Sequence, residues 1–165
     1  MKRVLFLGRF QPFHMGHLEV VKRLYGEYEL IIGIGSANYS RTELNPFTAD
    51  EREEMIKRVL EKEKINVKIV RVNDIELDDS YANYLFGIVK FDALACSNKR
   101  IIKYFKGKVE LIEFPLFYNL SATKIRKNIC NKELWKKFVH PEVYKYIKEI
   151  NGEEIIRNIG YYDDE

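Results

Sequence analysis

Long apolar runs, paired cysteines and flexible linkers are all missing from this chain of 165 residues. No apolar stretch approaches the roughly 20 residues of a membrane-spanning helix and no secretory leader is apparent, so we expect a cytoplasmic protein with no membrane partner. The two cysteines, Cys96 and Cys130, form no C-x-x-C pair, which argues against a structural zinc and favours a reducing compartment. Because no Pro/Gly/Ser-rich linker or internal repeat divides the chain, we expect one domain over residues 1–165.

A strong excess of charge of one sign is also missing. The formal net charge is only +3, although 32% of the residues are charged. Such a balance does not demand a nucleic-acid partner and none is expected, because a small phosphate-rich ligand suffices. Gln11 is the only glutamine beside abundant Lys, Glu and Ile, a composition typical of thermophiles.

Apolar runs alternate with helical patterns along most of the chain. This alternation predicts an α/β, Rossmann-like fold with an open parallel five-stranded sheet and helices on both faces. We expect strands near 2–7, 29–35, 67–72, 92–96 and 109–113, with helices near 15–25, 49–63, 79–89 and 99–105. After this core of about 1–113, a C-terminal helical segment of about 121–150 is expected to hold helices at 121–129, 132–138 and 141–150. The acidic end, 161–165, is expected to be frayed.

The segment 8–17, G-R-F-Q-P-F-H-M-G-H, joins the first expected strand to the first expected helix. Open α/β sheets bind ligands at such crossings, beyond the carboxyl ends of the strands. Gly8 lets the backbone turn or a phosphate approach, and Gly16 lies in the first helical turn, whose free N–H groups attract anions. His14 and His17 can face the same side of that turn, donate hydrogen bonds to phosphate, and carry positive charge when an anion raises their pKa. The segment therefore predicts a polyphosphate cradle.

Two plainer interpretations of this histidine pair remain open. A histidine at a helix start is often a cap or a solvated side chain. The H-x-x-H spacing is also half of a zinc site, which would need further ligands. With Gly8, Arg9, Pro12 and Gly16 in register we favour phosphate binding, and we expect no metal ligands from the chain.

The segment 120–126, L-S-A-T-K-I-R, is the second one with chemical content. Ser121 can cap a helix and leave N–H groups for a phosphate, to which Thr123 adds a hydroxyl group and Arg126 a planar guanidinium. The alternative is an ordinary capped amphipathic helix with its isoleucines facing inward and its cations solvated.

Both segments resemble those of one family. G-R-F-Q-P-x-H-x-G-H is similar to the motif of the archaeal-type nicotinamide-nucleotide (NMN) adenylyltransferases, in the HxGH nucleotidyltransferase superfamily. L-S-A-T-K-I-R resembles the superfamily element I-S-x-T-x-[IV]-R, with Leu120 and Ala122 in place of isoleucine and glycine. The stretch from 33–37 through 45–52 and the pair Ser97-Asn98 match more loosely, and the resemblance covers about residues 1–150.

The resemblance implies a transfer reaction of NAD biosynthesis. The phosphate of NMN attacks the α-phosphorus of ATP, which is bound with Mg²⁺, and NAD and pyrophosphate are formed. Since the acceptor phosphate is already an anion, no general base is implied, and catalysis depends on aligning two anions and offsetting their charge. A homo-oligomer, hexameric in the archaeal relatives, is implied as well.

The resemblance also implies the site residues. The expected catalytic residues are His14, His17, Arg9 and Arg126, with His17 the most important. ATP is expected to contact Gly8, Arg9, Phe10, His14, Gly16, His17, Ser121, Thr123 and Arg126. The acceptor is expected to contact Phe10, Arg41, Tyr81, Tyr84, Ser97 and Asn98. One of the two tyrosines replaces the family's stacking tryptophan, while Trp135 is expected in the core.

Two other kinds of function remain as alternatives. Adenylyl transfer to another phosphorylated acceptor, such as phosphopantetheine, FMN or nicotinate mononucleotide, needs the same triphosphate site. A non-catalytic nucleotide- or RNA-binding module would use basic clusters such as 124–127 and 99–100. A steep salt dependence of RNA affinity without turnover of ATP would favour the latter.

Overall fold

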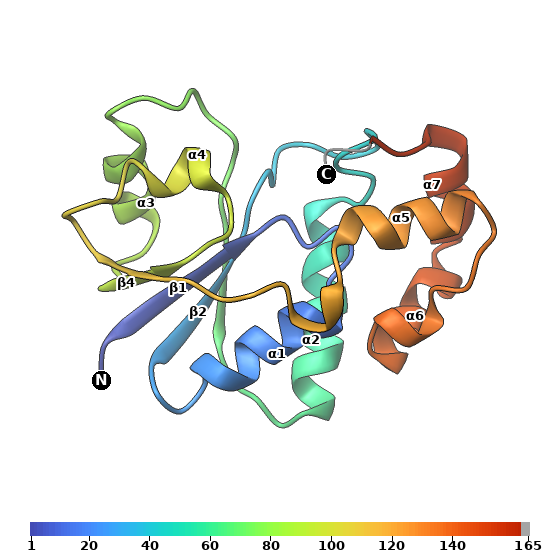
Figure 1. Ribbon diagram of the computed structural model, residues 1–165, viewed down its shortest axis with the longest axis horizontal. Helices are drawn as coiled ribbons and strands as arrows, with labels where there is room; N and C mark the ends of the chain where they lie inside the picture. The colour runs from blue at the N-terminus through green and yellow to red at the C-terminus, as the bar shows by residue number, and fades with distance from the viewer. Residues whose placement is uncertain (163–165) are drawn as a thin grey trace.

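The computed structural model describes residues 1–162 and shows a five-stranded sheet in the order β3-β2-β1-β4-β5 (Figure 1). The strands are β1 (Arg3–Gly8), β2 (Glu29–Ile34), β3 (Lys68–Arg71), β4 (Ala93–Ala95) and β5 (Glu110–Ile112). All four neighbouring pairs are parallel. The expected α/β, Rossmann-like fold with a parallel five-stranded sheet is confirmed.

Helices cover both faces of this sheet. They are α1 (Met15–Leu24), α2 (Ala49–Lys62), α3 (Tyr81–Ile88), α4 (Lys99–Ile102), α5 (Ala122–Cys130), α6 (Pro141–Glu149) and α7 (Gly152–Ile159), with 3₁₀ turns η1 (Phe117–Asn119) and η2 (Lys136–Phe138). Apolar side chains of α3 and α4 pack on one face, and those of α1, α2 and α5–α7 form the core on the other. Figure 1 shows the C-terminal helices gathered beside α1 and α2.

The alternation of side chains along β1 produces the two cores. Val4 and Phe6 point into the core beneath α1 and α2, whereas Leu5 and Leu7 point into the core beneath α3. Each of the four is at most 4% exposed, as expected of a central strand in a parallel sheet. The continuous apolar run of this strand is therefore buried on both faces.

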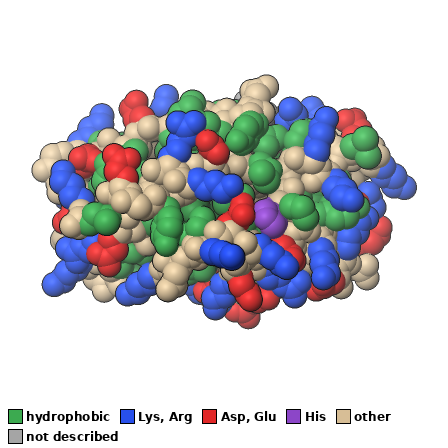
Figure 2. Space-filling view, turned by 90° about the horizontal axis from the view of Figure 1, so that it is seen from below, with side chains coloured by type: hydrophobic (Ala, Val, Ile, Leu, Met, Phe, Trp, Pro, Cys, Tyr) green, Lys and Arg blue, Asp and Glu red, His purple; other side chains and the backbone are tan. Residues whose placement is uncertain are grey.

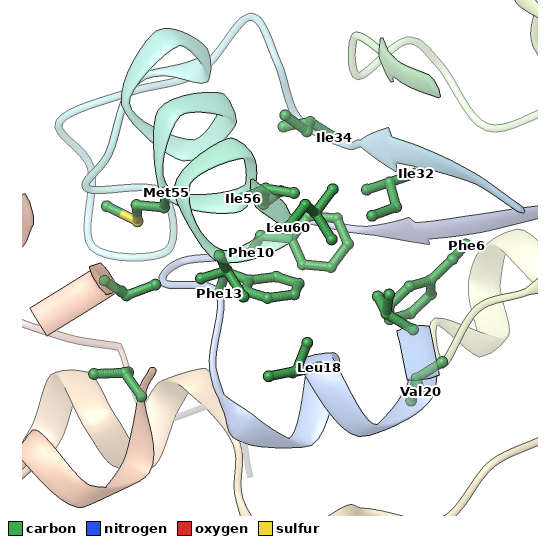
Figure 3. Close-up of a cluster of buried hydrophobic side chains, with 14 of the residues drawn as sticks. Phe6, Phe10, Phe13, Leu18, Val20, Ile32, Ile34, Met55, Ile56 and Leu60 are labelled. Atoms are coloured by element: carbon green, nitrogen blue, oxygen red, sulfur yellow. The ribbon is translucent and has the colours of Figure 1, made fainter. Parts of the chain in front are cut away.

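The segment between β1 and α1 is anchored by two aromatic rings. Phe10 and Phe13 are each 1% exposed, and Figure 3 shows them between α1 and α2, close to Leu18 and Leu60. Phe10 takes a left-handed backbone conformation, with φ at 56°. This burial fixes the loop that carries the expected phosphate cradle.

The prediction of a helix at 132–138 is wrong. Helix α5 ends at Cys130, Lys132 is left-handed with φ at 57°, and the 3₁₀ turn η2 is the one helical element between α5 and α6. The amide of Glu133 donates to the carbonyl of Asn128 at 2.8 Å, and the Asn128 side chain donates to Leu134 O at 2.9 Å. These bonds close the end of α5, and the residues between it and η2 are irregular.

Helix α7 was not expected. Its signal was present in Glu153 and Glu154 at the first turn and in Ile156, which is fully buried. Asn151, left-handed with φ at 57°, separates α7 from α6. The helix expected at 99–105 is only partly formed, since α4 spans Lys99–Ile102 and turns follow it. Of the end expected to be frayed, 163–165 lie outside the described residues.

The surface carries both signs of charge. The face in Figure 2 shows Lys and Arg side chains interspersed with Asp and Glu, in line with the net charge of +3. Within residues 1–162, no helix is long and apolar enough to cross a membrane. Trp135 is 4% exposed, which confirms its expected place in the core.

Candidate functional site

Two connected clefts lie at the carboxyl ends of the strands, where the order reverses between β1 and β4. The first, here called the α1/α5 cleft, has a volume of about 420 Å³ and lies between the starts of those two helices. The second, the α4 cleft, has a volume of about 1060 Å³ and is lined by the segment after β3 and the start of α4. Gly8, Arg9 and Ser97 line both, so the clefts are continuous.

The two histidines cap helix α1 for one another. His14 Nδ1 accepts from the amides of Gly16 at 3.0 Å and His17 at 3.3 Å, while His17 Nδ1 accepts from the amide of His14 at 3.1 Å. Their rings stack with centroids 3.6 Å apart. Because each Nδ1 is an acceptor, we assign the proton of each neutral ring to Nε2. Both rings line the α1/α5 cleft as Nε2–H donors.

The pair is neutral at pH 7. Burial lowers the pKa of His14 to about 3, and burial together with the charge of His14 lowers the pKa of His17 well below its usual value. Arg9 and Arg126 supply positive charge in the α1/α5 cleft. The expected positive charge on the imidazoles, which depends on a bound anion that raises their pKa, stays a prediction.

Gly8 and Gly16 are required by close packing. A Cβ on Gly16 would lie 2.9 Å from His14 Cε1 and 3.2 Å from the carbonyl of Phe117. A Cβ on Gly8 would lie 3.0 Å from the ring of Phe10. These contacts, rather than backbone flexibility, explain the glycines.

The ring of Phe10 packs against the ring of His17. Its ring centroid is 4.9 Å from that of His17 at an interplanar angle of 80°, and Phe13 stacks on the other side of His17 at 5.5 Å. Phe10 lines the α1/α5 cleft but not the α4 cleft. The structure therefore places this ring under the phosphate cradle and away from the expected acceptor contacts.

The second sequence segment meets the first in the α1/α5 cleft. Arg126 is 1% exposed and donates through Nη1 to Gln11 O at 2.9 Å and through Nη2 to Thr123 Oγ1 at 3.3 Å. Ser121 Oγ accepts from the amide of Lys124 at 3.1 Å and so caps α5. Ser121, Thr123 and Arg126 all line the same cleft as the two histidines.

Arg52 was missed by the sequence analysis. This fully buried side chain donates hydrogen bonds to five backbone carbonyls, those of Arg9, Gly35, Ser36, Tyr39 and Thr48, at 2.7 to 3.3 Å. Burial and the charge of Arg71 lower its pKa to about 10, which leaves it protonated at neutral pH. Arg52 thus ties the loop after β1 to the loop after β2.

A signal for Arg52 exists in the sequence. The residue stands three and four positions before Met55 and Ile56 and seven before Val59, on the apolar stripe of α2. An arginine on a buried stripe needs several acceptors, and these are the loop carbonyls. Gln11 plays a similar part, since its buried side chain bonds both the amide and the carbonyl of Phe47, at 2.9 and 3.1 Å.

The expected acceptor residues separate into two groups. Tyr81, Ser97 and Asn98 line the α4 cleft, and Tyr81 is only 3% exposed. Tyr84 does not line it, and its hydroxyl accepts from the amide of Asn73 at 3.0 Å. The structure thus brings one of the two tyrosines to the cleft.

Arg41 lies outside the lining of both clefts. Its guanidinium donates to both carboxylate oxygens of Glu51, at 2.6 and 2.8 Å, and to Pro46 O at 2.7 Å. Glu51 also accepts from the amide of Thr48 at 2.9 Å in the capping box of α2. In this arrangement Arg41 stabilises the start of α2 and does not join the other expected acceptor residues.

A third hollow of about 940 Å³ lies at the opposite, amino ends of the strands, where residues such as Tyr25 and Lys68 line it. None of the expected site residues lines it. Residues 1–162 contain no group of three or more His, Cys, Asp or Glu side chains that could hold a metal ion.

Comparison with known proteins assigns the chain to a family. The family model described as cytidylyltransferase-like matches residues 5–128. Proteins named nicotinamide-nucleotide adenylyltransferase from Thermoplasma acidophilum and Methanococcus maripaludis are 40% and 38% identical, each over 99% of this chain and over 95% and 99% of their own lengths. The protein of that name from Thermococcus kodakarensis is 39% identical over 97% of this chain and 89% of its own.

A solved structure supports the fold. The bifunctional NMN adenylyltransferase/ADP ribose pyrophosphatase of Francisella tularensis, in complex with AMP and a Mn ion, is similar with a TM-score of 0.78 and 24% identity. The similarity covers 96% of this chain and 52% of that one. Taken with the sequence relatives, the chain belongs to the cytidylyltransferase-like family and, within it, to the nicotinamide-nucleotide adenylyltransferases.

Proposed function

We propose that the protein transfers the adenylyl group of ATP to nicotinamide mononucleotide, giving NAD and pyrophosphate. The observation that carries this proposal is the meeting of the segments 8–17 and 120–126 in one cleft that opens into a second, larger one. The names of the archaeal relatives point to the same reaction.

The triphosphate fits the α1/α5 cleft, where two helices begin and His14 and His17 line the hollow. NMN fits the α4 cleft, with its pyridine ring near Tyr81 and its phosphate toward the shared residues Gly8 and Arg9. This arrangement brings the two reacting phosphates to the junction of the clefts.

The chemistry needs charge stabilisation and alignment. An oxygen of the NMN phosphate forms a bond to the α-phosphorus, the bond from that phosphorus to the α–β bridging oxygen breaks, and pyrophosphate leaves with the electron pair. His14 and His17 donate through Nε2–H to phosphate oxygens without changing protonation, and Arg9 and Arg126 offset negative charge. A divalent cation, Mg²⁺ in our proposal, enters with ATP on its phosphate oxygens as part of the substrate.

The test is an assay of the full chain with ATP, Mg²⁺ and a panel of acceptors: nicotinamide mononucleotide, nicotinate mononucleotide, FMN and phosphopantetheine. We expect pyrophosphate release and NAD formation with the nicotinamide compound. Pyrophosphate with FMN or phosphopantetheine alone would overturn the proposal, and so would RNA binding without any turnover of ATP. We further propose a cytoplasmic homo-oligomer, hexameric by resemblance, which light scattering of the purified protein tests.

A further inference from the structure

The α4 cleft carries opposite charges on different parts of its lining. The segment after β3 contributes Asp74 and Glu76, and the start of α4 contributes Lys99 and Arg100. Arg9 stands where this cleft joins the α1/α5 cleft. A ligand in the α4 cleft therefore meets cations toward its phosphate and anions elsewhere.

Asp74 is held in place by two residues of the loop after β2. Ser36 Oγ donates to Asp74 Oδ2 at 2.9 Å and Oδ1 at 3.0 Å. The amide of Asp74 donates to Asn38 Oδ1 at 2.8 Å, and Asn38 Nδ2 donates back to the carbonyl of Asp74 at 3.3 Å. One hydroxyl proton cannot saturate two carboxylate oxygens, so Asp74 keeps acceptor capacity for a ligand.

An aromatic ring completes this part of the cleft. Tyr81 lines the cleft with Asp74, and its pKa is raised by burial and, to a smaller extent, by Cys96 and Asp74. Its phenol is therefore neutral at pH 7. A cationic ring bound here would meet an aromatic side chain and a fixed carboxylate together.

Building on the proposed function, we infer that Asp74 selects the nicotinamide acceptor over the nicotinate acceptor. The pyridine ring of both mononucleotides is N-glycosylated and carries a positive charge. The nicotinamide form adds a neutral amide whose NH₂ can donate to a carboxylate, whereas the nicotinate form adds a second anion. A fixed carboxylate favours the first ligand and repels the second, which is specificity by both attraction and repulsion.

The test compares kcat/KM for the two mononucleotides, at saturating ATP and Mg²⁺, in the wild-type protein, Asp74→Asn and Asp79→Asn. Asparagine keeps the size of the side chain and an acceptor for Ser36 but removes the charge. Asp79 is an exposed acid of the same segment outside the cleft lining, and its variant controls for net charge. In Asp74→Asn we expect the ratio of nicotinamide to nicotinate kcat/KM to fall by about tenfold or more, and in Asp79→Asn by less than about twofold.

An unchanged ratio in a folded Asp74→Asn that uses both acceptors would overturn the inference while the proposed function stands. Absence of turnover with both acceptors in the wild-type protein would instead overturn the proposed function. A second measurement needs no variant: calorimetric affinities of the wild-type protein for the two mononucleotides at rising salt. Because salt screens the charge of Asp74, the difference between the two affinities should become smaller as the salt concentration rises. A difference that does not change with salt would contradict a charge-based selection.

Discussion

The two clefts differ in how their walls are held. In the α1/α5 cleft three of the expected functional groups are buried, with His14 at 5% exposure, Thr123 at 6% and Arg126 at 1%, and each of these is bonded to backbone or to a neighbouring side chain. His17 and Arg9 are half-buried. In the α4 cleft the charged residues, such as Asp74 and Lys99, are exposed and stand on loops or at the start of a short helix.

This difference indicates that the chemical step and the selection of the acceptor depend on different clefts. Groups that stabilise a developing charge act best when they are already oriented, because no reorganisation is then needed during reaction. Groups that select an acceptor can sit on exposed loops supported by a rigid sheet. We therefore assign the chemistry to the α1/α5 cleft and acceptor choice to the α4 cleft.

Arg52 connects the loops that border the two clefts, and we expect its removal to have the largest effect on the protein. Arg52→Met removes the side-chain donor to five backbone carbonyls, of which those of Ser36 and Thr48 also accept from a backbone amide, and we expect the free energy of unfolding to fall by about 3–5 kcal/mol. Unfolding in urea measures this change in the free energy of unfolding. Arg58→Met on the same helix, which loses surface ion pairs to Glu54 and Glu149 and the contact of its guanidinium with the Tyr146 ring, should cost about 1 kcal/mol. Equal losses in the two variants would contradict the role given to Arg52.

His17 tests the preorganised cleft directly. His17→Ala removes one Nε2–H donor and the acceptor for the His14 amide, and kcat should fall by about 10²–10³-fold. Steady-state kinetics with NMN measures this effect, and Lys22→Ala on the same helix, which removes only a surface pair with Glu63, should leave kcat unchanged. A His17→Ala enzyme with wild-type kcat would refute the assignment.

Gly16 tests whether the position of the His14 ring matters for activity, with a smaller expected effect. In Gly16→Ala the new methyl group presses on the His14 ring at 2.9 Å, and we expect kcat/KM for ATP to fall about tenfold to a hundredfold. Gly87→Ala is the matched control, because a Cβ there meets nothing within 4 Å. Replacing a glycine inside α3 by alanine should raise the free energy of unfolding by about 0.5–1 kcal/mol. If both variants keep wild-type kinetics, the close packing has no functional weight.

The neutral state of His14 predicts a further effect, on how the free energy of unfolding depends on pH. Its pKa is about 3 in the folded protein against an ordinary value of 6.5 in the unfolded chain, so the unfolded chain binds the extra proton between these values. The contribution is complete above pH 6.5 and is lost as the pH falls toward 3, at about 1.4 kcal/mol per pH unit. Chemical unfolding between about pH 4.5 and 7 should show a shallower slope in His14→Asn, which keeps a capping side chain. The same slope in both proteins would mean that His14 is not held neutral.

The sequence predicted those features that depend on local pattern. Alternating apolar runs predicted the strands, and the helix expected near 49–63 is found as α2, where Thr48 and Glu51 form both bonds of a capping box at 2.9 and 3.0 Å. The segments 8–17 and 120–126 were also singled out as chemical ones, and the structure brings them together in one cleft.

Features that depend on tertiary contacts could not be predicted in this way. The lowered pKa values of His14 and His17 follow from burial, which spacing alone does not reveal. Arg52 follows the spacing of a buried stripe, but a charged residue in a helix is normally solvated. The irregular stretch after Lys132 depends on bonds that close the end of α5, and the local pattern there favours a helix.

The most direct test of the account is a crystal structure of the protein with a non-hydrolysable ATP analogue, Mg²⁺ and nicotinamide mononucleotide. We expect triphosphate oxygens within hydrogen-bond distance of Nε2 of both His14 and His17, and the pyridine ring beside Tyr81 in the α4 cleft. Phosphates bound away from the α1/α5 cleft, or a mononucleotide in the hollow at the amino ends of the strands, would contradict it.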